Sequence, residues 1–148
     1  MKLNKNKKLN LGILVDRPFP HPSGKDQKGI MLLAFDLTDC IYELYAEMIL
    51  MQENILAEKL IKASVRHLRS MQNAFATANE SEYRNETESV IDALVEIRFW
   101  LKELQMKYEF STLSDESVEK VNALIIIVNY LAGKTQTNTV RAGFLTVN

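Results

Sequence analysis

The sequence predicts an all-α protein, an up-down antiparallel four-helix bundle with extended N- and C-terminal segments. All three prolines and three of the five glycines lie before residue 30, and the other two glycines lie after residue 132. The residues between contain neither helix breaker, and their apolar side chains recur with the helical period. Four such segments joined by short connections favour antiparallel neighbours in a bundle.

The chain divides into a basic N-terminal arm (residues 1–29), the bundle (30–133) and a C-terminal tail (134–148). The net charge is −1, but the arm carries +5, the tail +2 and the bundle −8. A chain of 148 residues is long enough to bury a core without disulfides or a structural metal. The β-prone pieces at 11–15 and 139–147 are candidates for a small two-stranded ribbon.

The expected location is the cytoplasm, with no membrane segment. Cys40 is the single cysteine, and the apolar run at 11–15 is too short for the core of a signal peptide. Residues 121–132 are apolar on nearly every side of a helical wheel, but a membrane span needs about 20 apolar residues. This stretch is therefore expected to be a buried helix at the centre of the bundle.

The first helix is predicted over residues 30–48. Its core face consists of Leu33, Leu37, Ile41, Leu44 and Met48. Its acidic stripe consists of Asp36, Asp39, Glu43 and Glu47.

The second helix is predicted over residues 54–78 and carries four cations on one face. The inward residues are Leu60, Ile61, Leu68, Met71 and Phe75. The basic stripe consists of Lys59, Lys62, Arg66 and Arg69. No proline or glycine separates this helix from the first, so one continuous helix of about 70 Å is the alternative to a break at 49–53.

The third helix is predicted over residues 79–108, with Asn79 and Glu82 in capping-box spacing. Its core stripe consists of Val90, Leu94, Ile97, Leu101 and Leu104. A second apolar set consists of Ile91, Val95 and Phe99. A monomer would leave this second set in water, so it is the predicted homo-oligomer interface.

The fourth helix is predicted to follow Ser114 as its N-cap and to continue to residue 132. Asp115 and Glu116 suit the positive end of the helix dipole. Gly133 suits the left-handed position after the C-terminus.

Few residues suit catalysis or metal binding. With two histidines and one cysteine, neither a nucleophilic triad nor the Glu-x-x-His pairs of a di-metal bundle can be assembled. We expect no enzyme activity, no cofactor and no metal, with His67 partly exposed and Cys40 a packing residue. Glu116 and Glu119 resemble the carboxylate pair of magnesium-dependent nucleotide pyrophosphatases, which is a remote alternative, because acidic residues early in a helix are expected for dipole reasons alone.

The two charge stripes have two interpretations. In one, the acidic stripe of the first helix and the basic stripe of the second form ion pairs, either with each other or with local partners. In the other, the basic stripe faces solvent and contacts successive phosphates of a nucleic acid, because residues three and four apart on a helix are about 5–6 Å apart.

The stretches AEKLIKASVRHLRSMQNAFATAN (57–79) and ALVEIRFWLKELQMKYEFSTLSDESVEKVNALIIIVNYLAG (93–133) resemble the four-helix-bundle superfamily of 23S rRNA intervening-sequence proteins. Within it, they look most like the accessory variability proteins (Avd) of diversity-generating retroelements. The resemblance lies in the Arg-aromatic element of the third helix, the loop ending in Leu-Ser and the small-residue–Gly end of the last helix.

This resemblance implies a pentameric, non-enzymatic RNA-binding protein that assists a retroelement reverse transcriptase. The residues that would contact RNA are Lys59, Lys62, Arg66, Arg69 and Arg98. The acidic bundle departs from the basic balance of that family. An oligomeric scaffold that binds only protein partners is therefore the alternative function.

Overall fold

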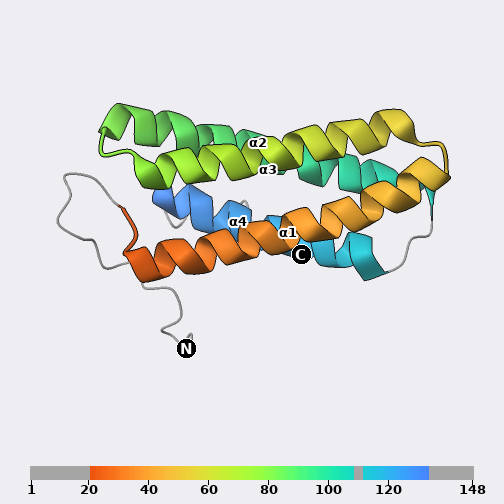
Figure 1. Cartoon of the computed structure of the whole chain (residues 1–148), viewed down its shortest axis with the longest axis horizontal. Coiled ribbons are helices and arrows are strands. Elements are labelled where there is room, and N and C mark those ends of the chain that lie inside the picture. Colours follow the sequence, from red (N-terminus) through yellow and green to blue (C-terminus); the bar gives the residue numbers. More distant parts are fainter. Residues whose placement is uncertain (1–20, 109–111, 134–148) are drawn as a thin grey trace.

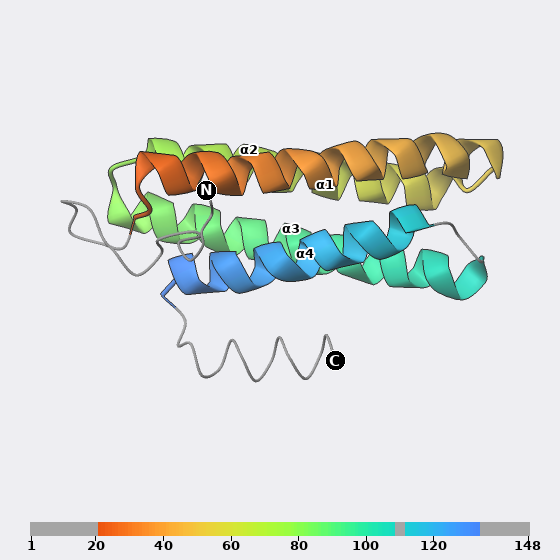
Figure 2. The ribbon, with the colours of Figure 1, turned by 90° about the horizontal axis from the view of Figure 1, so that it is seen from below.

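The computed structural model describes residues 21–108 and 112–133, which form four helices. They are α1 (Gly24–Leu50), α2 (Asn54–Ala76), α3 (Glu80–Lys107) and α4 (Thr112–Leu131). Helix α1 packs on α2, α2 on α3, α3 on α4, and α4 returns to α1 (Figures 1 and 2). The predicted up-down four-helix bundle is confirmed.

Helix α1 begins at Gly24, and the boundary predicted at residues 29 and 30 is wrong. The Asp26 backbone N–H donates to Ser23 Oγ at 3.1 Å, so Ser23 caps the helix before the glycines that were expected to delay it. Ahead of this cap, the ring of His21 is buried, with its centroid 5.2 Å from that of Tyr83. The last residues of the predicted arm therefore belong to the bundle.

Helices α1 and α2 are separate, as predicted, and the continuous-helix alternative is wrong. The break is a turn at Gln52, whose φ of 64° lies in the left-handed region that non-glycine residues rarely occupy. The Glu53 backbone N–H donates back to Met48 O at 2.8 Å, and the Glu53 carboxylate accepts from Lys107 Nζ at 2.9 Å. The ion pair between Glu53 and Lys107 therefore links the turn to the C-terminal end of α3.

Asn79 caps α3 as predicted, because its Oδ1 accepts from the Glu82 backbone N–H at 2.9 Å. The second half of the capping box differs. The Asn79 N–H donates to Thr77 Oγ1 at 3.1 Å, and the Thr77 hydroxyl donates to the Glu82 carboxylate at 2.6 Å. Thr77 thus stands between the two partners of the predicted box.

The prediction that Ser114 caps α4 is wrong, since the helix already begins at Thr112. Ser114 is buried inside the helix, where its hydroxyl accepts from Gln105 Nε2 of α3 at 3.1 Å. At the other end, Gly133 has a φ of 83°, which confirms the predicted left-handed residue.

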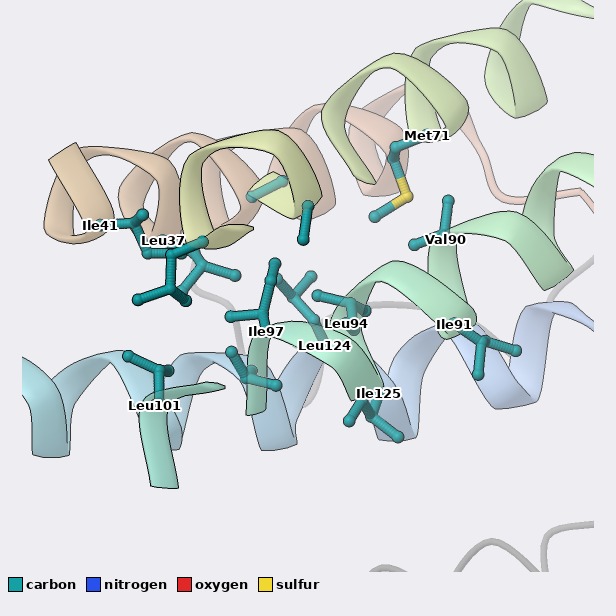
Figure 3. Packing of buried hydrophobic residues seen from close by; sticks show 14 of the residues in the cluster. Leu37, Ile41, Met71, Val90, Ile91, Leu94, Ile97, Leu101, Leu124 and Ile125 are labelled. Carbon is teal, nitrogen blue, oxygen red and sulfur yellow. The ribbon is translucent and has the colours of Figure 1, made fainter. Parts of the chain in front are cut away.

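The core is lined by apolar side chains from all four helices (Figure 3). The predicted core stripe of α3 is fully buried, and α1 contributes four of its five predicted residues, with Leu33 only partly buried. The predicted inward face of α2 is partly wrong, because Ile61, Leu68 and Phe75 are only half-buried. Small residues instead occupy several of the core-facing positions of α2. They are Ala57, Ala63, Ser64 and Ala74.

Helix α4 occupies a corner of the bundle like the other three helices, so the central position predicted for residues 121–132 is wrong. Its core side is formed by Val121, Leu124, Ile125, Val128 and Leu131. Ile126 and Ile127 on its other sides are only half-buried. Although α4 is apolar on nearly every side, it therefore does not lie at the centre of the bundle. Part of its apolar surface remains accessible to solvent.

The predicted terminal ribbon at 11–15 and 139–147 lies outside the described residues. Within 21–108 and 112–133, no helix is both long and apolar enough to cross a membrane.

Candidate nucleic-acid interface

The four cations of the predicted basic stripe all lie on the exposed surface of α2. Lys62 lies two residues after the buried Leu60, and Arg69 lies two residues before the buried Met71. A separation of two residues is about 200° around a helix, so these two cations point away from the core. Lys59 and Arg66 lie on the side of α2 that adjoins α3.

Two of the cations are held by α3. The Lys59 ammonium lies 5.1 Å from the centroid of a Trp100 ring, and Arg66 Nη2 lies 3.1 Å from Glu96 Oε1. The side chains of the Arg66–Glu96 pair are 44% and 38% exposed, so the pair contributes at most about 1 kcal/mol to stability. These contacts orient the two long side chains without removing them from solvent.

Lys62 and Arg69 form no ion pair with any residue that the structure describes. The acidic stripe of α1 does not reach them. Thr38 marks the side of α1 that faces α2, because its Oγ1 accepts from Ser64 Oγ at 3.3 Å. Asp36 lies two residues from Thr38, or about 200° around the helix, and Glu47 nine residues from it, or about 180°. The predicted pairing between the two stripes is therefore wrong.

A hollow of about 270 Å³ lies along the basic stripe between α2 and α3. Its lining includes Lys59, Lys62 and Arg66, together with the carboxylates of Glu58 and Glu96. Glu58 precedes Lys62 by one turn of α2, so the outer edge of α2 carries one carboxylate beside Lys62 and Arg69, while Glu96 lies at the α3 edge. An extended phosphate backbone would meet the cations along the outer edge.

Arg98 does not belong to this surface. It is half-buried between α3 and α4, where Nη1 donates to Asn122 Oδ1 at 2.9 Å. Arg98 therefore joins two helices, and the structure does not bring it together with the four cations of α2.

The predicted oligomer interface is divided by the structure. Ile91 is 8% exposed and lies beside α4 on the same side as Ile125 (Figure 3), so it belongs to the core of a single chain. Val95 and Phe99 are 43% and 52% exposed, and the Phe99 ring meets that of Trp100 edge-on at 4.8 Å. Only these two residues of the predicted set remain accessible.

A longer apolar surface, which the sequence analysis did not identify, lies on α1. Its exposed members are Leu32, Phe35, Tyr42, Tyr45, Ile49 and Leu50. The signal was available in the sequence, since Phe35, Tyr42, Tyr45 and Ile49 lie at helical spacing. The core stripe and the acidic stripe occupy the other two faces of the same helix, and the sequence prediction was limited to those two.

His67 is fully buried, and the prediction that it is partly exposed is wrong. Its Nδ1 lies 2.6 Å from Ser64 O, and Nε2 has no hydrogen-bond partner among the described residues. Burial lowers the pKa of the imidazole to about 4, against a smaller opposite effect of the Ser64 carbonyl. The ring is therefore neutral at pH 7. Its hydrogen bond is with the backbone carbonyl of Ser64 and not with the Ser64 hydroxyl, which donates to Thr38 Oγ1.

Cys40 is half-buried on the side of α1 near α4. Burial raises the pKa of its thiol, and the Lys120 charge and a hydrogen bond with Ser117 oppose that rise. A raised pKa disfavours the nucleophilic thiolate. Glu116 and Glu119 both lie on the exposed surface of α4. Within the part of the chain that the structure describes, no group of three histidine, cysteine or acidic residues is arranged to hold a metal ion.

Comparison with known proteins gives no match to a protein-family model, a curated protein or a solved structure.

Proposed function

We propose that this chain is a non-enzymatic, self-associating RNA-binding accessory protein that uses the basic row of α2 to contact the phosphate backbone. The observation that carries the proposal is the exposure of Lys59, Lys62, Arg66 and Arg69 along α2, with Lys62 and Arg69 unpaired among the described residues. Contacts of this kind bind nucleic acid with little regard to sequence.

The row has the geometry that such binding needs. It extends over residues 59–69, or about 15 Å at 1.5 Å per residue. Lys59 and Arg66 are oriented by Trp100 and Glu96, so their side chains lose less conformational freedom when they meet a phosphate. Lys62 and Arg69 project from the crest of the helix and require no rearrangement of the bundle.

The resemblance to the accessory variability proteins supplies the partner in this proposal. Under it, the chain assists a retroelement reverse transcriptase, and several copies, five in that family, bring their basic rows into one belt. Val95 and Phe99 are the accessible residues of the proposed contact between copies. A four-helix bundle is the fold that the resemblance implies.

Binding of a fluorescent single-stranded RNA, followed by anisotropy, tests the proposal. Replacing all four cations by Ala should weaken binding about 30-fold, if each phosphate contact contributes about 0.5 kcal/mol. Lys62→Ala with Arg69→Ala should weaken binding more than Lys59→Ala with Arg66→Ala, because the second pair is partly neutralised by α3.

The matched control is Lys28→Ala with Lys102→Ala, which changes the net charge equally on α1 and α3 and should leave binding within about twofold. Equal losses for the control and for either α2 pair would mean that net charge, and not the row, attracts the RNA. Unchanged binding by the fourfold variant would refute the proposal.

A scaffold that binds only protein is the second candidate, and the exposed apolar side chains of α1 favour it. It predicts that the parent protein binds no RNA at moderate salt. The same titration therefore separates the two functions.

A further inference from the structure

We infer that the face formed by α1 and α2 is an isologous interface on which a second copy of this chain docks, with α1 of each copy lying over α2 of the other. The interface differs from the contact at Val95 and Phe99, and it does not depend on RNA binding.

The centre of the face is apolar from Phe35 to Ile49. The Ser64–Thr38 hydrogen bond fixes which sides of α1 and α2 adjoin each other. Phe35, Tyr42 and Tyr45 lie three, four and seven residues from Thr38, and they are 43%, 49% and 36% exposed. Residues so spaced share the side of α1 that borders α2. Ile49 continues the row at 39% exposure.

Helix α2 supplies the other half of the face. Ile61, Val65 and Leu68 lie three, one and four residues from Ser64, and all three are half-buried. At the end near the start of α1, Met31 and Phe35 line a hollow of about 510 Å³ together with Phe75 of α2. The lining of this hollow also includes the polar residues Gln27, Lys28 and Gln72. Apart from Lys28 at this end, no residue named on this central strip is charged, whereas the bundle as a whole carries −8.

The size of the face suits a stable pair. Helix α2 has 23 residues, which at 1.5 Å per residue gives a length of about 35 Å. Two helices side by side are about 20 Å wide, so the face offers roughly 700 Å² per copy, near the 800 Å² typical of specific interfaces. Aromatic side chains of this kind are enriched at the centres of such interfaces.

The charges at the edges select a second copy and its orientation. The α1 edge carries Asp39 and Glu43, and the α2 edge carries Lys62 and Arg69 together with one acid, Glu58. A twofold axis parallel to the helices brings the acidic edge of each copy to the basic edge of the other, whereas a twofold axis across the helices would bring like charges together.

The register along the helices also agrees. Measured from the level of the Thr38–Ser64 contact, Asp39 lies about 1.5 Å and Lys62 about 3 Å toward the same end, because α1 and α2 are antiparallel. A twofold axis parallel to the helices preserves height, so Asp39 of one copy lies level with Lys62 of the other. Such exposed pairs contribute little affinity and leave the cations accessible to phosphate.

Light scattering of the full chain at tens of micromolar, without RNA, tests the inference. Phe35→Asp with Tyr42→Asp should halve the mass of the parent assembly. The matched control is Met106→Asp with Ala123→Asp, which adds the same charge at exposed positions of α3 and α4 and should leave the mass unchanged. Circular dichroism confirms that each variant retains its helices.

A parent that is monomeric, or a Phe35→Asp, Tyr42→Asp variant with the mass of the parent, would overturn the inference and assign this face to a different partner. The orientation is tested by reversing charges. Asp39→Lys and Lys62→Asp should each weaken pairing several-fold, and the two changes together should restore it. Absence of recovery would overturn the arrangement of α1 over α2. RNA affinity is measured separately. A monomeric parent would also remove self-association from the proposed function, whereas an assembled parent whose mass is unchanged in the Phe35→Asp, Tyr42→Asp variant would overturn this interface alone.

Discussion

The burial and the protonation state of a residue in this bundle depend on its neighbours in space, as His67 shows. Its sequence neighbours are basic and polar, yet the ring lies in the core with Nδ1 against Ser64 O. The neutral imidazole forms one hydrogen bond there. A charged imidazolium would be buried without a carboxylate among its hydrogen-bonding partners, so protonation opposes folding.

The chain should therefore lose stability as the pH falls from 7 to 5. The unfolded imidazole has a pKa near 6.5 and the folded one a pKa of about 4, so the unfolded state takes up more protons in this window and is favoured as the pH falls. The contribution of His67 amounts to about 2 kcal/mol between pH 7 and pH 5.

Urea unfolding at the two pH values measures this loss, with His67→Leu as the control. The variant keeps the volume filled and removes the titrating group, so its pH dependence should be smaller by about 2 kcal/mol. An identical pH dependence in the parent and the variant would show that the ring is not buried in its neutral form.

Ile91 provides a second test at the scale of a residue. Because its side chain is buried between α3 and α4, Ile91→Ala should lower the free energy of unfolding by about 2–3 kcal/mol and leave the mass in solution unchanged. Thermal or urea unfolding with light scattering checks both parts. A smaller assembly with no loss of stability would restore Ile91 to the oligomer interface.

At the scale of the helices, the caps and turns set the boundaries. Ser23, Asn79 and Gly133 mark helix ends by side-chain or backbone geometry that their residue types favour. Gln52 does so against its preference, since a left-handed backbone costs a non-glycine residue about 1–2 kcal/mol.

Gln52→Gly should therefore stabilise the bundle by about 0.5–1 kcal/mol, because relief of the left-handed strain exceeds the added freedom of the unfolded chain. Gly133→Ala is the complementary change. It meets no neighbouring atom within 4 Å but must adopt a φ of 83°, so it should destabilise by about 1 kcal/mol. Shifts of the same sign in the two unfolding midpoints would contradict this explanation of the turns.

The sequence predicted the number, order and approximate ends of the helices because breakers, caps and the helical period are local signals. It failed where the answer depends on a neighbouring helix. Ser114 is a good cap by residue type, yet its hydroxyl lies inside α4 and accepts a hydrogen bond from Gln105 of α3. Likewise, the basic row was identified from spacing alone, but the absence of pairing with the acidic stripe follows from the orientation of α1, which the Thr38–Ser64 contact sets.

Across the described residues of the bundle, four surfaces differ in chemistry. The face of α1 and α2 is aromatic and apolar, α2 carries cations along its crest, and the exposed side of α1 toward α4 is acidic. Val95 and Phe99 form a smaller apolar patch beyond α3. Such a separation suits a protein that binds copies of itself on apolar faces and an anionic partner on another.

The contact at the smaller patch has its own prediction. Phe99→Glu places a charge on a side chain that is 52% exposed, so the fold should persist while any assembly through this patch dissociates into a smaller species. Light scattering measures the mass, and Glu103→Gln, a polar change one turn further along α3, is the control. An unchanged mass in the Phe99→Glu variant would remove Val95 and Phe99 from the set of interface residues.

The most direct test of the proposed RNA binding is the dependence of affinity for single-stranded RNA on salt concentration. If the four cations of α2 each neutralise one phosphate, the slope of log K against log salt should be about −3 per chain. Lys62→Ala with Arg69→Ala should reduce the slope to about −1.5. A slope near zero in the parent, or the parent slope retained after all four cations are removed, would contradict the account.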